Sequence, residues 1–256
     1  MKTKCINKLK LLFLSFFIIS FFGACQFFKK NDGNNADLDK NVKKSYRKDG
    51  TLLATVHYKD SLRHGLARNY YTNGKVQLEI NYVEGKKHGF ATQYYENGDV
   101  YLKIPYENDM RNGIQLKYYE KNILMAEIPY RDNQLMPGLK EYDKQGKLIT
   151  KPNKINFKLK DMTAFDNKLD LEMTLADGSK NAQFMVVSEP EQSGNQTDLY
   201  YVATKNGIGV ETYYVLPGHA IKKTIHYKAE RKTRLGHTEI HYETYLLNFT
   251  NMKRFD

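Results

Sequence analysis

The stretch EGKKHGFATQYYENG, residues 84–98, decides the fold, because its spacing of tyrosine and glycine recurs on both sides. Tyrosines lie 24 residues apart at Tyr46, Tyr70, Tyr94, Tyr118 and Tyr142. Glycine follows four residues later in four of these five copies, and Asn122 takes its place in the other. A fixed period of this length is typical of repeat architectures. Residues 42–150 are therefore predicted to form an array of similar units.

Each unit has the pattern of a β-hairpin. Val76, Leu78, Ile80 and Tyr82 alternate with polar neighbours, and the same alternation returns at intervals of 24 residues. Side chains on a strand point to opposite faces in turn, so a period of two predicts strands with one apolar face. Consecutive hairpins predict a long antiparallel meander that is stabilised by contacts between neighbouring units.

The sequence also suggests where the turns lie. Asn73-Gly74 and Asn97-Gly98 are dipeptides preferred in type I′ turns, so we place tight turns there and longer turns, such as 108–113, at the opposite end. Since the period is even, we expect even-numbered residues of the intervening strands, such as Leu66 and Phe90, to share the apolar face.

A second domain is predicted for residues 151–256, because the 24-residue register stops after Lys151-Pro152. Alternating apolar runs predict strands near 155–160, 169–175, 183–188, 198–204, 209–215, 221–228 and 238–249. This density of short strands favours a β-sandwich, with an immunoglobulin-like arrangement as one option, although the Cys–Trp–Cys signature is missing.

The first residues predict export. A basic start precedes the apolar run Leu11–Phe22, which is shorter than a membrane span, so residues 1–24 are interpreted as a signal peptide. The ending Phe22-Gly-Ala-Cys25 resembles a bacterial lipobox, with Phe where an aliphatic residue is usual. The resemblance implies acylation of Cys25, and residues 25–41 then form a polar, flexible tether. An ordinary secretory signal is the alternative.

Cysteine content agrees with a lipid-anchored chain. Only Cys5 and Cys25 are present, and Cys5 would leave with the signal, so no intramolecular disulfide is expected. Gln26 follows the proposed acylated Cys25, which by analogy implies the outer membrane. We therefore expect a protein of the bacterial cell envelope.

The segment 84–98 resembles the MORN repeat in its bacterial variant, which characterises the antitoxin-like YwqK family. The resemblance covers about 45–150, and its best copies begin at Gly65 and Gly89. The copy from Gly113 lacks the second glycine, and the copy from Gly138 lacks the paired tyrosines. The expected fold is all-β: an antiparallel meander of MORN-type hairpins followed by a β-sandwich-like domain. The resemblance also implies an immunity function as one alternative.

The sequence supplies no recognisable reactive centre. His237 and His241 lie four residues apart in a segment of strand composition, roughly 13 Å from one another, so they are interpreted as exposed strand histidines and not metal ligands. His64 and His88 are interpreted as turn-stabilising residues. We therefore predict no catalytic residue, no metal, no cofactor and no enzymatic activity.

The second tyrosines of the repeats, Tyr71, Tyr95 and Tyr119, have odd numbers and are expected on the polar face. Two readings stay open for them. They pack between stacked hairpins, as cross-strand pairs do, or they form an aromatic stripe that binds a protein, glycan or lipid, since tyrosine is enriched in interfaces.

The charge distribution excludes one class of partner. The formal net charge is +11, but both signs are interspersed and four of the positive charges are lysines of the first ten residues, so no nucleic-acid partner is expected. The favoured function is an envelope scaffold that contacts the membrane through its anchor and binds an envelope protein. A toxin-neutralising protein and a lipid- or glycan-binding protein are the alternatives.

Overall fold

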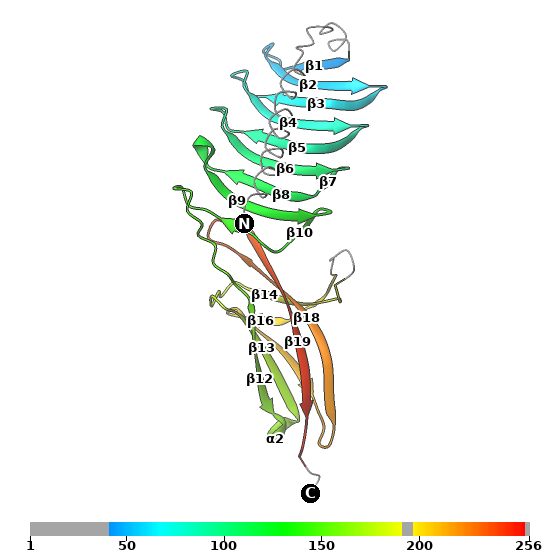
Figure 1. Cartoon of the computed structure of the whole chain (residues 1–256), viewed down its shortest axis with the longest axis vertical. Helices are drawn as coiled ribbons and strands as arrows, with labels where there is room; N and C mark the ends of the chain where they lie inside the picture. The colour runs from blue at the N-terminus through cyan, green and yellow to red at the C-terminus, as the bar shows by residue number, and fades with distance from the viewer. Residues whose placement is uncertain (1–40, 191–196, 254–256) are drawn as a thin grey trace, which may run out of the picture. The chain divides into compact units, whose positions relative to one another are not determined.

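The computed structural model describes residues 41–190 and 197–253, and the region from Lys43 onward forms one compact unit. The signal peptide, Cys25 and nearly all of the tether lie outside the described residues. The described chain is almost entirely antiparallel β-structure, as the alternating sequence pattern predicts (Figure 1).

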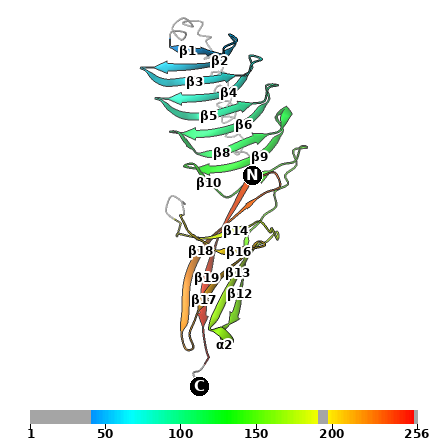
Figure 2. The same cartoon turned by 180° about the vertical axis from the view of Figure 1, so that it is seen from behind.

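The repeats form one sheet of eleven strands in which neighbours along the chain pair with each other (Figures 1 and 2). The order is β1-β2-β3-β4-β5-β6-β8-β9-β10, with β7 paired to β6 and β11 paired to β9. The strands are β1 (Val42–Tyr46), β2 (Leu52–Lys59), β3 (Leu62–Tyr70), β4 (Val76–Val83), β5 (Lys86–Tyr94), β6 (Val100–Glu107), β7 (Met110–Arg111), β8 (Gly113–Tyr118), β9 (Leu124–Arg131), β10 (Gln134–Leu135) and β11 (Lys140–Glu141). This topology confirms the predicted meander.

The tight turns lie at the opposite ends of the hairpins from those predicted. Val83 pairs with Lys86 across Glu84-Gly85, both of which have positive φ, and this is the type I′ geometry. The other copies turn at Asp60-Ser61, Asn108-Asp109 and Asp132-Asn133, again with positive φ at both residues.

The prediction of type I′ turns at the Asn-Gly dipeptides was wrong. At Asn73-Gly74 only the glycine has positive φ, at 81°. Asn73 instead uses its side-chain oxygen to accept a hydrogen bond from the Lys75 N–H at 2.9 Å, while Gly74 N–H donates to the Tyr71 carbonyl at 3.0 Å. The dipeptide therefore closes a wider turn with a glycine in the left-handed region.

The predicted parity of the intervening strands was also wrong. Ile80 faces Ala91 across β4 and β5, so an even-numbered residue shares its face with an odd-numbered one. Phe90 pairs with Pro105 on the other face and is 56% exposed. When a two-residue turn joins two strands, the residue numbers of each facing pair add up to an odd value. Leu66 and Phe90 therefore lie on the other face of the sheet from the even-numbered isoleucines of the neighbouring strands.

We call the first of these two surfaces the isoleucine face. The strand registers place three kinds of residue on it: an aliphatic centre, small residues between the aliphatic ones, and tyrosines near the type I′ turns. Its central members are Val56, Ala67, Ile80, Ala91, Ile104, Ala126 and Ile128. Large and small side chains therefore alternate from β2 to β6, while in the last copy Gln115 of β8 faces Ile128.

The C-terminal part forms two further four-stranded sheets. One has the order β12 (Ile155–Met162), β13 (Lys168–Leu175), β17 (Ile208–Tyr214) and β16 (Ala203–Lys205). The other has the order β15 (Asp198–Tyr201), β14 (Gln183–Val187), β18 (Ala220–Lys232) and β19 (Thr238–Thr250). A single-turn helix, α2 (Thr163–Asp166), joins β12 to β13.

Both sheets contribute to one core, which gives a β-sandwich. Leu171 and Met173 of the first sheet and Phe184 and Tyr227 of the second are fully buried in the same cluster. The segment predicted as one strand at 198–204 divides at Val202 between the two sheets. The strand orders are those of an immunoglobulin-like sandwich, with β12-β13-β17-β16 in the places of strands A-B-E-D and β15-β14-β18-β19 in those of C′-C-F-G, so that option is confirmed.

Candidate functional site: the isoleucine face of the repeats

From β2 to β10, the strand residues that the registers place on the isoleucine face include no acidic side chain; Glu141 of β11, which faces Ala126, is the exception. The other polar members of this face are amides and cations, such as Asn69, Gln93 and Lys117. The carboxylates of β2 to β10 lie on the other face, where Glu79 pairs with Arg68 at 2.7 Å. The two faces of one sheet thus differ in charge.

Tyrosines and cations alternate along one margin of this face, which we call the tyrosine–cation row. Its members are Lys43, Tyr58, Arg63, Tyr82, Lys87, Tyr106, Arg111 and Tyr130. Each cation lies over the ring of the tyrosine on the next strand, at 4.9, 5.4, 4.8 and 4.1 Å from the ring centroid in chain order. Such contacts contribute about 0.5–1 kcal/mol each at exposed sites.

The type I′ turns fix the backbone of this row. Asp109 accepts a hydrogen bond from Lys87 N–H through its side chain at 2.8 Å, and Asn133 does the same for Arg111 at 2.8 Å. In return, the Asp109 N–H donates to the Lys87 carbonyl at 3.0 Å. Successive turns are therefore joined, and the cations start from fixed positions.

None of the row cations forms an ion pair with a carboxylate within the described residues. Arg63 instead donates to the Tyr82 hydroxyl at 3.4 Å, and this hydrogen bond raises the pKa of Arg63. Sequence reasoning missed the row, although Arg63, Lys87 and Arg111 follow the 24-residue period. The signal was present as a basic residue two positions before each repeat glycine.

The last copy of the aliphatic centre is covered and the earlier copies are not. Ala126, Ile128 and Leu139 form a buried cluster, against which Tyr130 and Leu135 pack. Leu139 comes from the segment that follows β10. Val56, Ile80 and Ile104 belong to no such cluster among the described residues and stay partly exposed.

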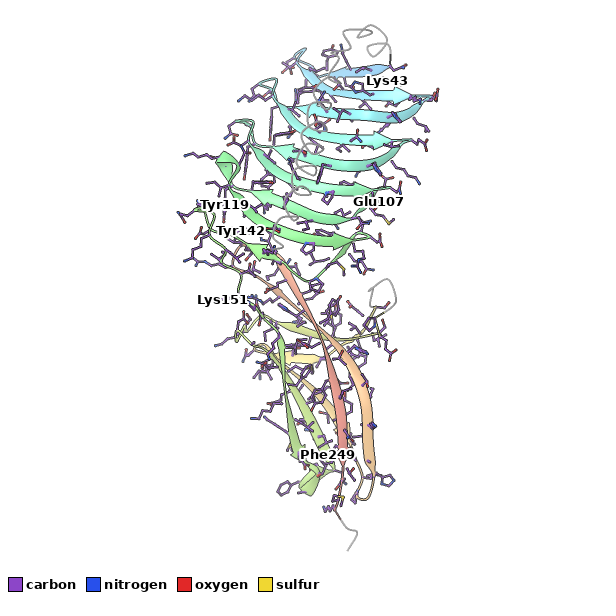
Figure 3. All side chains as sticks on the ribbon, viewed as in Figure 1. Lys43, Glu107, Tyr119, Tyr142, Lys151 and Phe249 are labelled. Atoms are coloured by element: carbon purple, nitrogen blue, oxygen red, sulfur yellow. The ribbon has the colours of Figure 1, made fainter. Side chains whose placement is uncertain are left out.

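The candidate binding tyrosines have a structural contact. Tyr71, Tyr95 and Tyr119 donate their hydroxyl hydrogens to the carbonyls of Tyr94, Tyr118 and Tyr142, at 2.7, 2.8 and 3.1 Å. Figure 3 labels the last pair, Tyr119 and Tyr142, on the repeat sheet. Each hydroxyl therefore links one repeat to the next. This geometry favours the packing reading, and a role in partner binding stays a prediction.

The histidines near the C-terminus are not exposed strand residues, so that interpretation was wrong. His237 is 9% exposed, and its Nδ1 lies 2.6 Å from Glu141 Oε1. The same carboxylate oxygen accepts from the Thr233 hydroxyl at 2.6 Å. Glu141 belongs to β11 of the repeat sheet, so one buried carboxylate connects the repeats to the β18–β19 hairpin. Residue numbers 96 apart could not reveal this pair.

The repeat histidine His64 has the local role expected of it. The Glu84 N–H lies 3.5 Å from His64 Nδ1, at the type I′ turn of the next repeat. His88 contributes its backbone, because its carbonyl accepts a hydrogen bond from the Asn81 side chain at 3.0 Å.

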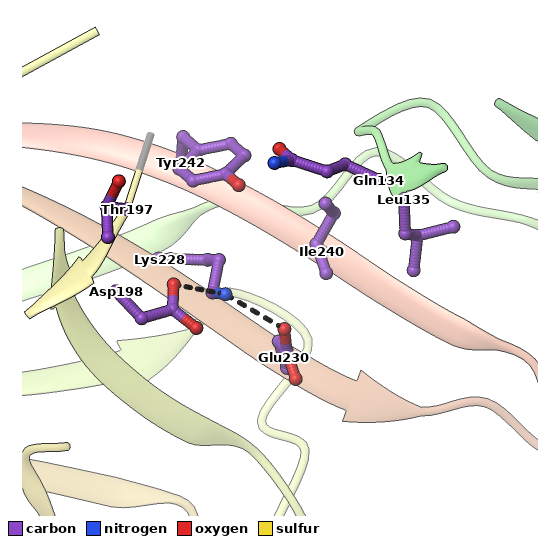
Figure 4. Close-up of a pocket in the computed structure, with 8 residues that line it drawn as sticks. All are labelled: Gln134, Leu135, Thr197, Asp198, Lys228, Glu230, Ile240 and Tyr242. Atoms are coloured by element: carbon purple, nitrogen blue, oxygen red, sulfur yellow. Dashed lines mark ion pairs between the residues drawn. The ribbon is translucent and has the colours of Figure 1, made fainter. Parts of the chain in front are cut away.

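A pocket of about 430 Å³ lies beside Lys228 (Figure 4). Lys228 forms ion pairs with Asp198 at 2.5 Å and with Glu230 at 3.1 Å. Burial by itself would lower the pKa of Lys228, but the two carboxylates outweigh it and raise the pKa. The amine therefore stays protonated, which makes it a poor nucleophile.

Two tyrosines of the sandwich, the exposed Tyr200 and the fully buried Tyr227, contact Glu211. Its carboxylate accepts hydrogen bonds from Tyr200, at 2.5 Å, and from Tyr227. Burial and this acceptor raise the pKa of Tyr200 to about 12. The arrangement satisfies the hydroxyl of the buried Tyr227 and keeps both tyrosines neutral at physiological pH.

Residues 41–190 and 197–253 contain no group of three or more His, Cys, Asp or Glu side chains placed to hold a metal ion. Within the same part of the chain, no helix has the length and apolar character needed to cross a membrane.

Three consecutive segments match the family described as MORN repeat variant, at residues 63–84, 87–108 and 111–132. Each match begins at a cation of the tyrosine–cation row and ends within a type I′ turn. The starts are 24 residues apart, in the register read from the sequence. The chain therefore contains three MORN variant repeats, which together make up well under half of its length.

One solved structure similar to this chain is the tetra-tandem repeat in the extending region of a large adhesion protein, at 13% sequence identity. The alignment covers 80% of this chain and 66% of that chain, just under two thirds of its length, with a TM-score of 0.21. A likeness at this score supports no argument about function. No curated protein matches the sequence.

Proposed function

We propose that this protein is a non-enzymatic, lipid-anchored component of the bacterial cell envelope that binds another protein through its MORN variant repeats. The observation that carries the proposal is the uncovered part of the isoleucine face, around Val56, Ile80 and Ile104. A partly exposed aliphatic surface bordered by cations is a common feature of protein interfaces.

The repeat architecture supports binding in a second way. Three copies of the same surface lie side by side and are joined by hydrogen bonds at both hairpin ends, through Tyr71 and Tyr95 at one end and Asp109 at the other. A surface of this kind loses little conformational entropy when it binds, so more of the contact energy appears as affinity.

In-cell cross-linking of the anchored protein, followed by mass spectrometry, tests this proposal. We expect one dominant envelope protein to be recovered. If that protein is a secreted toxin, and expression of this chain protects cells from it, the immunity alternative replaces the scaffold. If no protein is enriched over an unrelated anchored control, the proposal of a protein-binding module fails and lipid or glycan binding becomes the leading alternative.

The anchor is a separate part of the proposal, supported by the lipobox-like ending at Cys25. Metabolic labelling with a palmitate analogue should mark the wild-type chain and not a Cys25→Ser variant. Cys5→Ser is the matched control, because Cys5 leaves with the proposed signal peptide and its replacement should keep the label. Equal labelling of Cys25→Ser and wild type would contradict the anchor.

A further inference from the structure

The uncovered part of the isoleucine face has a regular spacing. Val56, Ile80 and Ile104 lie on alternate strands, so neighbouring members are about 9.6 Å apart, twice the distance between paired strands. Ala67 and Ala91 lie on the strands between them; Ala67 is partly exposed and Ala91 is buried by its neighbours. The centre of the face thus presents aliphatic ridges at a fixed interval.

This interval fits a helix better than a strand. Seven residues of α-helix rise about 10.5 Å, and a tilt of about 24° from the array axis brings this repeat to about 9.6 Å. In an extended chain, side chains on one face recur about every 6.7 Å, which does not match. Three copies span about 19 Å, or roughly 13 residues of helix.

The chain itself shows that this surface accepts an apolar side chain from another segment. Leu139 packs on Ala126 and Ile128 in the last copy, and it is 5% exposed there. The positions of Ala126 and Ile128 correspond, 24 and 48 residues earlier, to Leu102 with Ile104 and to Leu78 with Ile80. These aliphatic pairs should pack against leucine-sized side chains in the same way.

The positive charges beside the aliphatic centre determine which residues a partner would carry on its polar side. Arg63, Lys87 and Arg111 form one line beside the aliphatic centre, and none of them has a carboxylate partner among the described residues. Their repeat matches that of Val56, Ile80 and Ile104, because both follow the strands. Acidic residues on one flank of a docked helix would therefore meet each cation in turn.

We propose that Val56, Ile80 and Ile104, together with Arg63, Lys87 and Arg111, bind an acidic amphipathic α-helix of a partner protein. This inference rests on the proposed protein-binding function and names the chemistry of the partner. A helix is favoured over an anionic membrane because the three aliphatic side chains are only partly exposed. The side chains of a partner protein can reach them between their neighbours on the sheet, whereas a bilayer cannot.

A synthetic peptide tests the proposal on the full chain. The probe is a fluorescein-labelled 21-residue peptide with leucines at two positions of each heptad and glutamates along one flank; a scrambled peptide of the same composition is its control. Fluorescence anisotropy should show saturable binding of the probe at least tenfold tighter than that of the scrambled peptide. Equal binding of the two peptides would overturn the proposal.

Variants locate the binding. Ile80→Glu and Lys87→Glu should each weaken binding of the probe at least tenfold, and Lys87→Glu should bind a lysine-flanked version of the peptide better than wild type does. The controls are Phe90→Glu and Lys103→Glu on the opposite face, which should leave affinity unchanged within twofold. If circular dichroism shows that Ile80→Glu or Lys87→Glu does not fold, the milder Ile80→Ala and Lys87→Gln variants replace them in the binding measurement.

The outcomes separate this inference from the proposed function. If cross-linking in cells captures a protein whose binding does not depend on Ile80 or Lys87, the function stands and the helix site is refuted. If no protein is captured, the function itself fails. If the protein binds vesicles of phosphatidylglycerol and phosphatidylcholine but not the peptide, and the Ile80 and Lys87 variants weaken the vesicle binding, the partner is a lipid surface and the proposal is refuted.

Discussion

Replacing Tyr95 by phenylalanine separates a packing role of the repeat tyrosines from a binding role. The Tyr95 hydroxyl donates to the Tyr118 carbonyl at 2.8 Å and thereby links two repeats. The substitution removes this hydrogen bond but keeps the ring, which meets Tyr101 edge-on at a centroid distance of 5.0 Å. Only the hydrogen bond between repeats is lost.

The size of the effect follows from the exposure of the bond. A net intramolecular hydrogen bond contributes about 0.5–1.5 kcal/mol, and because Tyr95 is only partly buried, water can rehydrate the Tyr118 carbonyl. We expect a loss of about 1 kcal/mol in the free energy of local opening, which accelerates amide exchange about fivefold. Repeats farther along the array should change little.

Hydrogen exchange followed by mass spectrometry measures this change, because it reports each repeat separately. Tyr101→Phe is the matched control: its hydroxyl has no hydrogen-bond partner among the described residues, so exchange should stay at the wild-type rate. Unchanged exchange in Tyr95→Phe, combined with loss of a cross-linked partner, would refute the packing argument and restore the aromatic stripe formed by Tyr71, Tyr95 and Tyr119.

Three other substitutions test separate parts of the molecule. Glu141→Ala leaves the buried donors of His237 and Thr233 without their acceptor. The free energy of unfolding, measured by urea denaturation, should therefore fall by about 1–3 kcal/mol. An unchanged value would contradict the connecting role of this carboxylate. Gly74→Ala places a residue with a side chain at a φ of 81° and should lower the free energy of unfolding by about 1–2 kcal/mol. Gly74→Asn should lower it less, because Asn122 holds the equivalent position of another repeat at a φ of 55°. Equal losses in the two variants would contradict this explanation. Because the pKa of Tyr200 is raised to about 12 in the folded state, its stabilising contribution is complete below the ordinary value of 10.0 and is lost as the pH rises from about 10 to about 12. Glu211→Gln should shift the Tyr200 titration, followed by ultraviolet absorbance, to lower pH, and an unchanged titration would show that Glu211 is not a cause.

The sequence predicted which segments form strands because alternation is a local property. The runs near 155–160 and 169–175 became β12 and β13 within two residues at each end. The 24-residue period also gave the register of the three matched repeats, since corresponding strands pair at the same relative positions.

The error over faces had one cause. We expected even-numbered residues to share a face because the period is even, but an even period fixes only that successive copies repeat, and not how the two strands of one hairpin face each other. The two-residue turn at Glu84-Gly85 pairs Val83 with Lys86, so an even-numbered residue of one strand faces an odd-numbered residue of the next. A shift of one residue moves a strand's whole set of side chains to the opposite face.

The candidate site could be read only in part. A period of basic residues at Arg63, Lys87 and Arg111 is visible in the sequence, but their position over tyrosine rings depends on which face each strand presents. The Glu141–His237 contact joins segments that are 96 residues apart, and no local pattern connects them.

The sequence by itself determined the repeat length, the strands and the antiparallel pairing of neighbours, because these follow from periodicity and from short-range chain connections. Only the tertiary structure decided that β2 to β10 place no carboxylate on the isoleucine face, that cations line its margin, and that Leu139 packs against its last copy. The physical reason is that the turn sets the register, and the register decides which side chains meet.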